Sequence, residues 1–178
     1  DPAKLEDPHL IIYNAVLTLR ETTVVTNGDQ TDTIAQFMNG NLFPGYSFEA
    51  ALATRTYEDD APNFTPRISG VVKPDCTYNL SILKSLDGDP DCCCRYFFEY
   101  DHAAPGVGHF IHTYQEDVNP LPSFEGEPRR VAIPQLSAQE WAKKLWASLN
   151  EDNKVSLYVS MIDVHTGSRD SVIINKHG

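Results

Sequence analysis

The sequence contains no long apolar run and few basic residues. No stretch approaches the roughly 20 apolar residues that a membrane-spanning helix needs. Lys and Arg number 14 against 25 Asp and Glu, which gives a formal net charge of −11. Nucleic acids and anionic membranes are bound through basic surfaces, so we expect neither as a partner. We interpret the acidity as a source of solubility.

No signal peptide is visible, and the chain begins with Asp1-Pro2 rather than Met. The sequence therefore predicts a processed or trimmed product, and it leaves the compartment open.

Common catalytic signatures are also missing. The chain has no Gly-x-Gly-x-x-Gly pattern, P-loop, His-Glu-x-x-His pattern or Gly-x-Ser-x-Gly pattern. We therefore predict no cofactor, and the balance leans toward a protein that is not an enzyme. A Ser/His/Asp triad is defined by geometry rather than by order in the chain, so the missing motifs leave that possibility open.

The length and composition of the chain suit a single folded domain. It has 178 residues, of which 41% are hydrophobic, enough for a packed core. We predict one domain over residues 1–178. Residues 1–8 would form a flexible N-terminal arm, and residues 117–128 a long proline-rich loop.

The most regular stretch is residues 91–117, which alternates aromatic and polar residues on either side of a turn at Pro105. Folding back at this turn would place Tyr100 opposite Phe110 and Phe98 opposite His112. A second turn at Gly88 would place Leu80 opposite Tyr96. Together they predict a three-stranded antiparallel meander. Strand-like patterns also occur at residues 10–25, 46–57, 68–83, 129–133, 154–164 and 171–176.

Two helices are expected, a short one at residues 31–38 and an amphipathic one at about 137–149. Ser137 and Glu140 form a capping-box pattern, and Trp141, Leu145 and Leu149 form an apolar stripe. We therefore predict a mainly β fold, an antiparallel β-sandwich or jelly-roll-like domain with the second helix packed on it.

The four cysteines are expected to be free thiols. The predicted meander places Cys76 on the order of 20 Å from Cys94, beyond the reach of a disulfide. This slightly favours a reducing, cytoplasmic compartment. Two glycosylation sequons, at Asn63 and Asn79, leave secretion open.

Two groups of polar residues could bind metal. His109 or His112 with a carboxylate could form a site in a small β-barrel metalloprotein or enzyme, although residues three apart lie on opposite faces of a strand. The acidic loops at Asp87–Asp91 and Glu58–Asp60 could bind calcium, but acidic turns are the simpler interpretation. Whether the protein binds a metal is left unknown.

Many strands, proline-rich loops and missing catalytic motifs favour a non-catalytic binding or interaction module. We expect a glycan or a protein as its partner, with the oligomeric state open. Aromatic loop residues suit sugar rings, so the predicted ligand-binding residues are Tyr46, Phe64 and Phe124. The alternative is the metalloprotein or enzyme that uses His109 or His112.

Overall fold

The computed structural model describes residues 12–40 and 48–177. The chain divides into two compact units. Unit 1 comprises Asp1–Ala104 and Gly108–Val131, and unit 2 comprises Pro105–Val107 and Ala132–Gly178. The expectation of one domain stays a prediction. The predicted arm at residues 1–8 lies outside the described residues.

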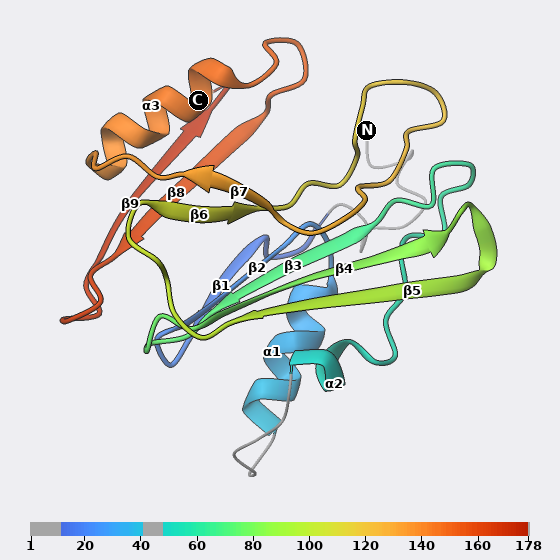
Figure 1. Ribbon diagram of the computed structural model, residues 1–178, viewed down its shortest axis with the longest axis horizontal. Helices are drawn as coiled ribbons and strands as arrows, with labels where there is room; N and C mark the ends of the chain where they lie inside the picture. The colour runs from blue at the N-terminus through green and yellow to red at the C-terminus, as the bar shows by residue number, and fades with distance from the viewer. Residues whose placement is uncertain (1–11, 41–47, 178) are drawn as a thin grey trace. The chain divides into compact units, whose positions relative to one another are not determined.

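Unit 1 contains a five-stranded antiparallel sheet with the strands in chain order, together with two helices (Figure 1). Its strands are β1 (Val16–Leu19), β2 (Thr22–Thr26), β3 (Arg67–Val72), β4 (Tyr78–Leu86) and β5 (Asp89–Tyr100). The helices are α1 (Gln30–Gly40) and α2 (Phe48–Leu52). Helix α1 confirms the predicted short helix. Helix α2 lies where a strand was predicted, at residues 46–57.

Two tight turns connect strands of this sheet, and the sequence prediction missed the first of them. The backbone turns at Arg20 and Glu21, with φ angles of 46° and 72°, and splits the single strand predicted at residues 10–25 into β1 and β2. Asp87 and Gly88, with φ angles of 52° and 82°, connect β4 to β5. Such positive φ angles at both central residues define the hairpin turn that matches the twist of the flanking strands.

The pairing of β4 with β5 is confirmed, but its register differs from the prediction. Leu86 pairs with Asp89 and Ser85 with Cys93, so residues 90–92 of β5 form a bulge. Beyond the bulge Leu80 lies opposite Phe98 rather than Tyr96. The two-residue error keeps each side chain on its predicted face of the sheet.

The core of unit 1 lies between the sheet and its two helices. Val24, Val71 and Leu83 project from β2, β3 and β4 and pack with Ile34 of α1 and Leu52 of α2. Burial of each such aliphatic side chain contributes about 1.5–3 kcal/mol. The other face of β4 and β5 carries Tyr78, Ile82, Lys84, Tyr96 and Phe98, because strand side chains alternate.

The hairpin predicted at Pro105 is wrong. The strand that follows the turn, β6 (Val107–Phe110), pairs with β7 (Arg129–Ala132) rather than with β5. In place of the expected cross-strand pairs, Tyr100 stacks on Tyr78 at 4.4 Å and on His109 at 4.1 Å between ring centroids. The two prolines at 120 and 122 lie in the segment that joins β6 to β7.

In unit 2, helix α3 (Ala138–Ser148) packs on a hairpin of β8 (Ser156–Ile162) and β9 (Arg169–Asn175). The capping box is present: Ser137 Oγ accepts from the Glu140 backbone N–H, and the Ser137 N–H donates to Glu140 Oε2. Ala138, Ala142 and Val159 form the buried core of this unit. The predicted amphipathic helix and the last hairpin are both confirmed.

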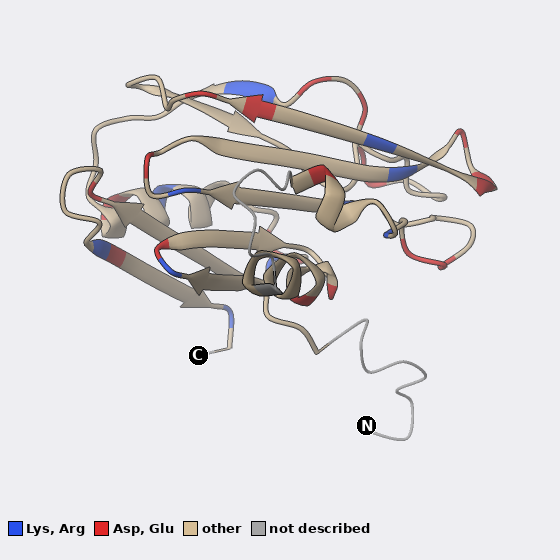
Figure 2. Cartoon of the chain, turned by 90° about the horizontal axis from the view of Figure 1, so that it is seen from below, with Lys and Arg blue, Asp and Glu red and all other residues tan. Residues whose placement is uncertain are grey.

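The mainly β class is therefore confirmed, whereas the sandwich or jelly-roll arrangement is not. The described strands form one five-stranded sheet and two two-stranded sheets. Acidic positions gather at loops and strand ends, with basic positions interspersed among them (Figure 2). Among the described residues, no helix is long and apolar enough to cross a membrane.

Candidate functional site

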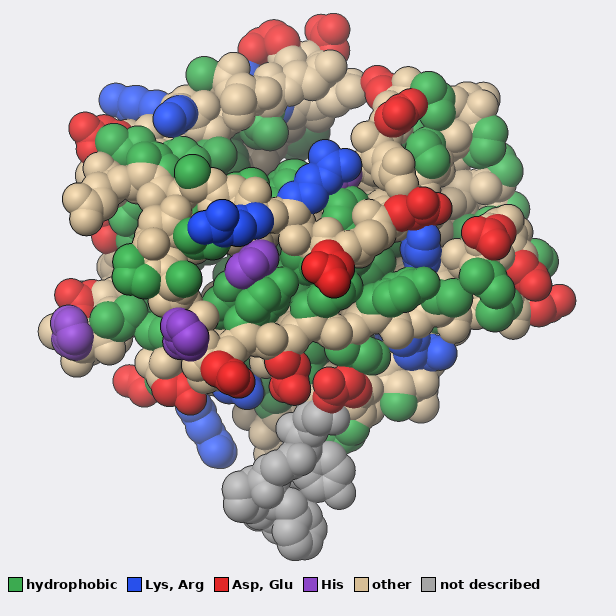
Figure 3. Space-filling model, viewed as in Figure 1, with side chains coloured by type: hydrophobic (Ala, Val, Ile, Leu, Met, Phe, Trp, Pro, Cys, Tyr) green, Lys and Arg blue, Asp and Glu red, His purple; other side chains and the backbone are tan. Residues whose placement is uncertain are grey.

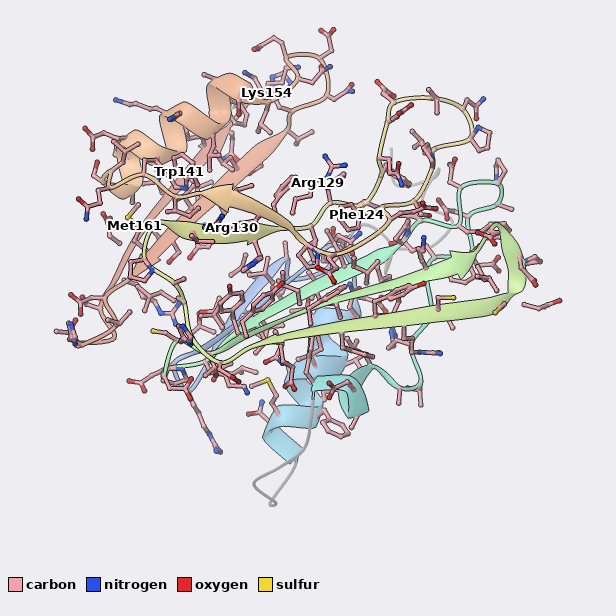
Figure 4. The ribbon with its side chains drawn as sticks, viewed as in Figure 1. Phe124, Arg129, Arg130, Trp141, Lys154 and Met161 are labelled. Carbon is pink, nitrogen blue, oxygen red and sulfur yellow. The ribbon has the colours of Figure 1, made fainter. Side chains whose placement is uncertain are left out.

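Of the three predicted ligand-binding aromatics, the structure describes Phe64 and Phe124. Tyr46 lies outside the described residues. Phe64 packs edge-on against Tyr57, with 5.6 Å between the ring centroids. Phe124 is only 1% exposed. Its ring lies edge-on to His112, and the Arg129 guanidinium is 6.0 Å from its centroid (Figure 4).

The two candidate histidines occupy separate aromatic environments. His109 Nδ1 is 2.6 Å from the hydroxyl of Tyr78. His112 stacks on Phe110, and its Nδ1 is 2.6 Å from the carbonyl oxygen of Tyr114, to which it donates. Among the described residues, His112 Nε2 is buried without a hydrogen-bond partner. Both histidines are therefore packed against neighbouring residues of unit 1, as structural histidines are.

The structure also describes the acidic loops and the four cysteines. The described residues contain no group of three or more His, Cys, Asp or Glu side chains placed to hold a metal ion. In the loop that contains Glu58, Asp60 accepts hydrogen bonds from the backbone and hydroxyl of Thr65. All four cysteines are free, as predicted.

The densest group of charges in unit 1 is one that the sequence prediction missed. We call it the Arg67 cluster, which comprises Asp29, Gln30, Arg55, Glu58 and Arg67. Arg67 begins β3 and is 9% exposed. Its Nη1 lies 2.7 Å from Asp29 Oδ1 and 3.8 Å from Glu58 Oε1. Arg55 pairs with the same oxygen of Asp29.

The turn before α1 forms a close-fitting support for Arg67. Gln30 is fully buried, and its Oε1 accepts from Arg67 Nη1 at 2.9 Å. Its amide donates to Asn27 Oδ1 and to the carbonyl of Ile68. A Cβ atom at Gly28 would lie 2.3 Å from Arg67 Nη1, so only glycine fits here without displacing the guanidinium. Nη1 of Arg67 thus has three polar partners, on Asp29, Gln30 and Glu58.

Burial raises several pKa values around this cluster. Desolvation raises the pKa of Glu58 above its ordinary value of 4.5, although the nearby Arg67 opposes the shift. Desolvation also raises the pKa of Tyr13, with a further contribution from Glu58. The pKa of Tyr114 is raised by burial, while its hydrogen bond with Thr65 lowers it. Structural ion-pair networks and functional sites both produce such shifts.

A second feature of unit 1 is a cavity of about 470 Å³ over the face of β4 and β5 that is opposite the helices. We call it the Lys84 cavity. The segment 124–127 also lines it. Figure 3 shows a band of hydrophobic side chains along β4 and β5, with charged side chains beside it. The residues that line the cavity are Ile82, Lys84, Leu86, Asp87, Tyr96, Phe98, Phe124, Glu125, Gly126 and Glu127.

Lys84 is the cation of this cavity, and it is weakly partnered. Its side chain is 13% exposed, and its charged partner among the described residues is Glu125, 66% exposed, with 3.7 Å between Nζ and Oε1. An ammonium group can donate three hydrogen bonds, and 3.7 Å is too long for a good one. Lys84 also lines a smaller hollow of about 290 Å³ beside Asn63 and Phe64. The ammonium is therefore available to a ligand.

The sequence contains a pattern that indicates both the Arg67 cluster and the Lys84 cavity. Arg67 shares an inward face with Ser69 and Val71, and Lys84 shares one with Leu80 and Ile82. A charged residue on an apolar face of a strand is rarely buried without a partner or a function. The partners, however, come from distant segments that only the fold brings together.

Comparisons with known proteins identify the family. A family model described as "IMP cyclohydrolase-like protein" matches residues 1–167. An IMP cyclohydrolase of Halobacterium salinarum is 33% identical over 85 residues, which are 48% of this chain and 43% of the relative. An IMP cyclohydrolase of Methanopyrus kandleri is 28% identical over 137 residues, covering 70% of this chain and 67% of the relative. The alignment with the Halobacterium relative thus spans less than half of that protein.

These similarities overturn the functional prediction made from the sequence. The non-catalytic, carbohydrate-binding module with a glycan partner is wrong, because the matching family and relatives are named as enzymes that act on a nucleotide. The prediction failed because it took missing motifs as evidence against catalysis, whereas an active site can be assembled from scattered residues. The family model covers nearly the whole chain, and the chain therefore belongs to the IMP cyclohydrolase-like protein family.

Proposed function

We propose that this chain catalyses the reaction for which its relatives are named. In that reaction, water opens the six-membered ring of the base of inosine monophosphate (IMP), or loss of water closes it. The observation that carries the proposal is the family match over residues 1–167. It supports a purine nucleotide as the substrate class and ring closure or hydrolysis as the chemistry.

The reaction itself sets what the site must provide. In ring closure, the carboxamide nitrogen of an imidazole ribonucleotide bonds to the carbon of a formyl group carried by the neighbouring amino nitrogen. The carboxamide and formamide nitrogens each lose one proton, and both protons leave with the formyl oxygen as water. The protein must therefore bind a planar heterocycle, stabilise charge on oxygen and transfer protons.

The Lys84 cavity supports this proposal. Its volume of about 470 Å³ lies within the range of about 300–1,000 Å³ that is usual for small-molecule pockets. Tyr96 and Phe98 offer flat apolar surfaces, Lys84 offers an ammonium group, and Glu125 offers a carboxylate beside it. The Arg67 cluster, by contrast, has most of its charges already paired.

The test is ring closure by the purified chain itself. The substrate is 5-formamidoimidazole-4-carboxamide ribonucleotide, and the measured quantity is the rise of the ultraviolet absorbance of the hypoxanthine ring. We expect a rate proportional to protein concentration, and mass spectrometry should identify IMP as the product. Heat-denatured protein and buffer alone serve as controls. A folded chain that gives no more IMP than buffer would overturn the proposal.

A further inference from the structure

The charges in the Lys84 cavity distinguish one end of a nucleotide from the other. Asp87, Glu125 and Glu127 bring three carboxylates to one ammonium, that of Lys84. A phosphate monoester carries nearly two negative charges at neutral pH. Placing it among these carboxylates would cost free energy by like-charge repulsion. An uncharged heterocycle meets no such penalty.

The walls of the cavity suit the flat faces of a heterocycle. Tyr96 and Phe98 lie two residues apart on β5, so their rings project from the same face of the sheet. Phe124 lines the same cavity from the segment that follows β6. Aromatic rings stack well on planar bases, and that stacking does not require charge.

The side chains of Lys84 and Glu125 place polar groups at one point of this apolar lining. Lys84 can only donate hydrogen bonds, and an ionised Glu125 can only accept them. The base of IMP and its ring-opened precursor present a carbonyl oxygen next to an N–H group. A donor and an acceptor side by side, with 3.7 Å between Lys84 Nζ and Glu125 Oε1, match that pair of groups.

This inference rests on the proposed function. We propose that the Lys84 cavity takes the base end of the nucleotide and leaves the phosphate outside, with Lys84 and Glu125 as catalytic residues. During ring closure Glu125 accepts the proton that the carboxamide nitrogen loses as its bond to the formyl carbon forms. It returns that proton to the formyl oxygen, which also receives the proton that the formamide nitrogen loses as its double bond to the formyl carbon forms. The bond between the formyl carbon and this oxygen breaks, and the oxygen leaves as water. The Lys84 ammonium donates to the carboxamide oxygen, on which negative charge develops as the neighbouring nitrogen loses its proton.

The orientation is tested by comparing the binding of IMP and of inosine, which lacks the phosphate. Isothermal titration of Lys84→Gln should show that both ligands lose affinity by a similar factor, about tenfold or more. If the variant bound inosine as wild type does but lost IMP affinity, Lys84 would be meeting the phosphate, and the proposed orientation would be overturned. Unchanged affinity for both ligands would overturn it as well.

The catalytic roles are tested by kinetics with matched controls. Lys84→Gln and Glu125→Gln should each lower kcat about 100-fold, and Lys84→Arg should recover part of the loss. Lys73→Gln and Glu116→Gln replace exposed residues of the same types outside the cavity and should behave as wild type. Circular dichroism verifies folding, and Lys84→Met, which keeps an apolar stem, replaces Lys84→Gln if that variant does not fold.

The two proposals fail in different ways. An active wild type whose Lys84 and Glu125 variants match their controls would overturn the catalytic roles and leave the cyclohydrolase activity standing. A wild type that binds inosine in a Lys84-dependent manner but closes no ring would overturn the proposed function and the catalytic roles, while the orientation would stand.

Discussion

Arg67 and Lys84 are basic residues at the same end of the sheet, and their surroundings differ in an informative way. Arg67 pairs directly across the strands with Leu83, the residue before Lys84. Because side chains alternate along a strand, Arg67 points toward the helices and Lys84 toward the cavity. Arg67 has Asp29, Gln30 and Glu58 around it, whereas within residues 12–40 and 48–177 Lys84 has one ion pair, at 3.7 Å.

The difference distinguishes a charged residue that stabilises the fold from a charged residue that can bind a ligand. A buried charge whose hydrogen-bonding positions are filled is costly to remove, since its partners are left unpaired. A charge beside a cavity with few partners contributes little to stability and can bind a ligand. This comparison leads to four predictions, which we give from the largest expected effect to the smallest.

Arg67→Met should be the most destabilising change. It leaves Asp29 and Glu58 half-buried with one fewer cation, and breaking a buried charge network in this way costs about 3–5 kcal/mol. Urea denaturation of wild type and variant measures the difference. Arg130→Met, at an exposed position, is the control. A loss below about 1 kcal/mol would show that the cluster does not maintain the fold.

Gly28→Ala tests the same region through shape rather than charge. The added methyl group would lie 2.3 Å from Arg67 Nη1 and 2.6 Å from Gln30 Oε1, so the guanidinium must move. We expect a loss of about 1–3 kcal/mol, as for other overpacked sites. Gly126→Ala meets no atom within 4 Å, but its φ of +86° makes it strained, so Gly70→Ala, whose nearest contact would be the side-chain end of Leu80 at 3.3 Å, is the cleaner control. Thermal and urea midpoints are the measurements.

Glu58→Gln should change how stability depends on pH. Burial raises the pKa of Glu58, so the folded protein binds this proton more tightly than the unfolded chain does. Its contribution to stability is therefore fully present below the ordinary pKa of 4.5 and is lost as pH rises through the raised value. Between about pH 4 and pH 7, wild type should lose stability relative to Glu58→Gln. Urea midpoints across this range would contradict the prediction if the two proteins changed in parallel.

Lys84→Gln should have the smallest effect on stability. Its ion pair with Glu125 joins it to an exposed carboxylate, and such pairs contribute about 0–1 kcal/mol. We expect a change of no more than about 0.5 kcal/mol in urea denaturation. A loss as large as that of Arg67→Met would mean that Lys84 is structural and that the two regions do not differ.

The sequence predicted the elements with strong local signals. The capping box at Ser137 and Glu140 placed α3 correctly, because both partners lie within one turn of the helix. The alternation in β4 and β5 assigned Ile82, Tyr96 and Phe98 to one face. The register was wrong because the bulge at residues 90–92 has no distinct local pattern.

The candidate site could not be predicted from local patterns, because its residues are far apart in the sequence. Glu125 follows Lys84 by 41 positions and reaches it only through the long segment between β6 and β7. The hairpin expected at Pro105 would have placed that segment elsewhere. His109 and His112 were predicted as candidates for a metal or enzyme site because of their residue type, yet both pack against aromatic rings in the structure.

The bulge in β5 has a consequence for how the cavity could change. It holds three residues, 90–92, an odd number. If the same sequence paired with two residues in the bulge instead of three, Cys93, Arg95 and Phe97 would lie on the face of Lys84 in place of Cys94, Tyr96 and Phe98. A slip of β5 by one residue against β4 would thus exchange one whole side of the strand for the other. The length of the bulge therefore sets whether the cavity wall is aromatic or carries an arginine.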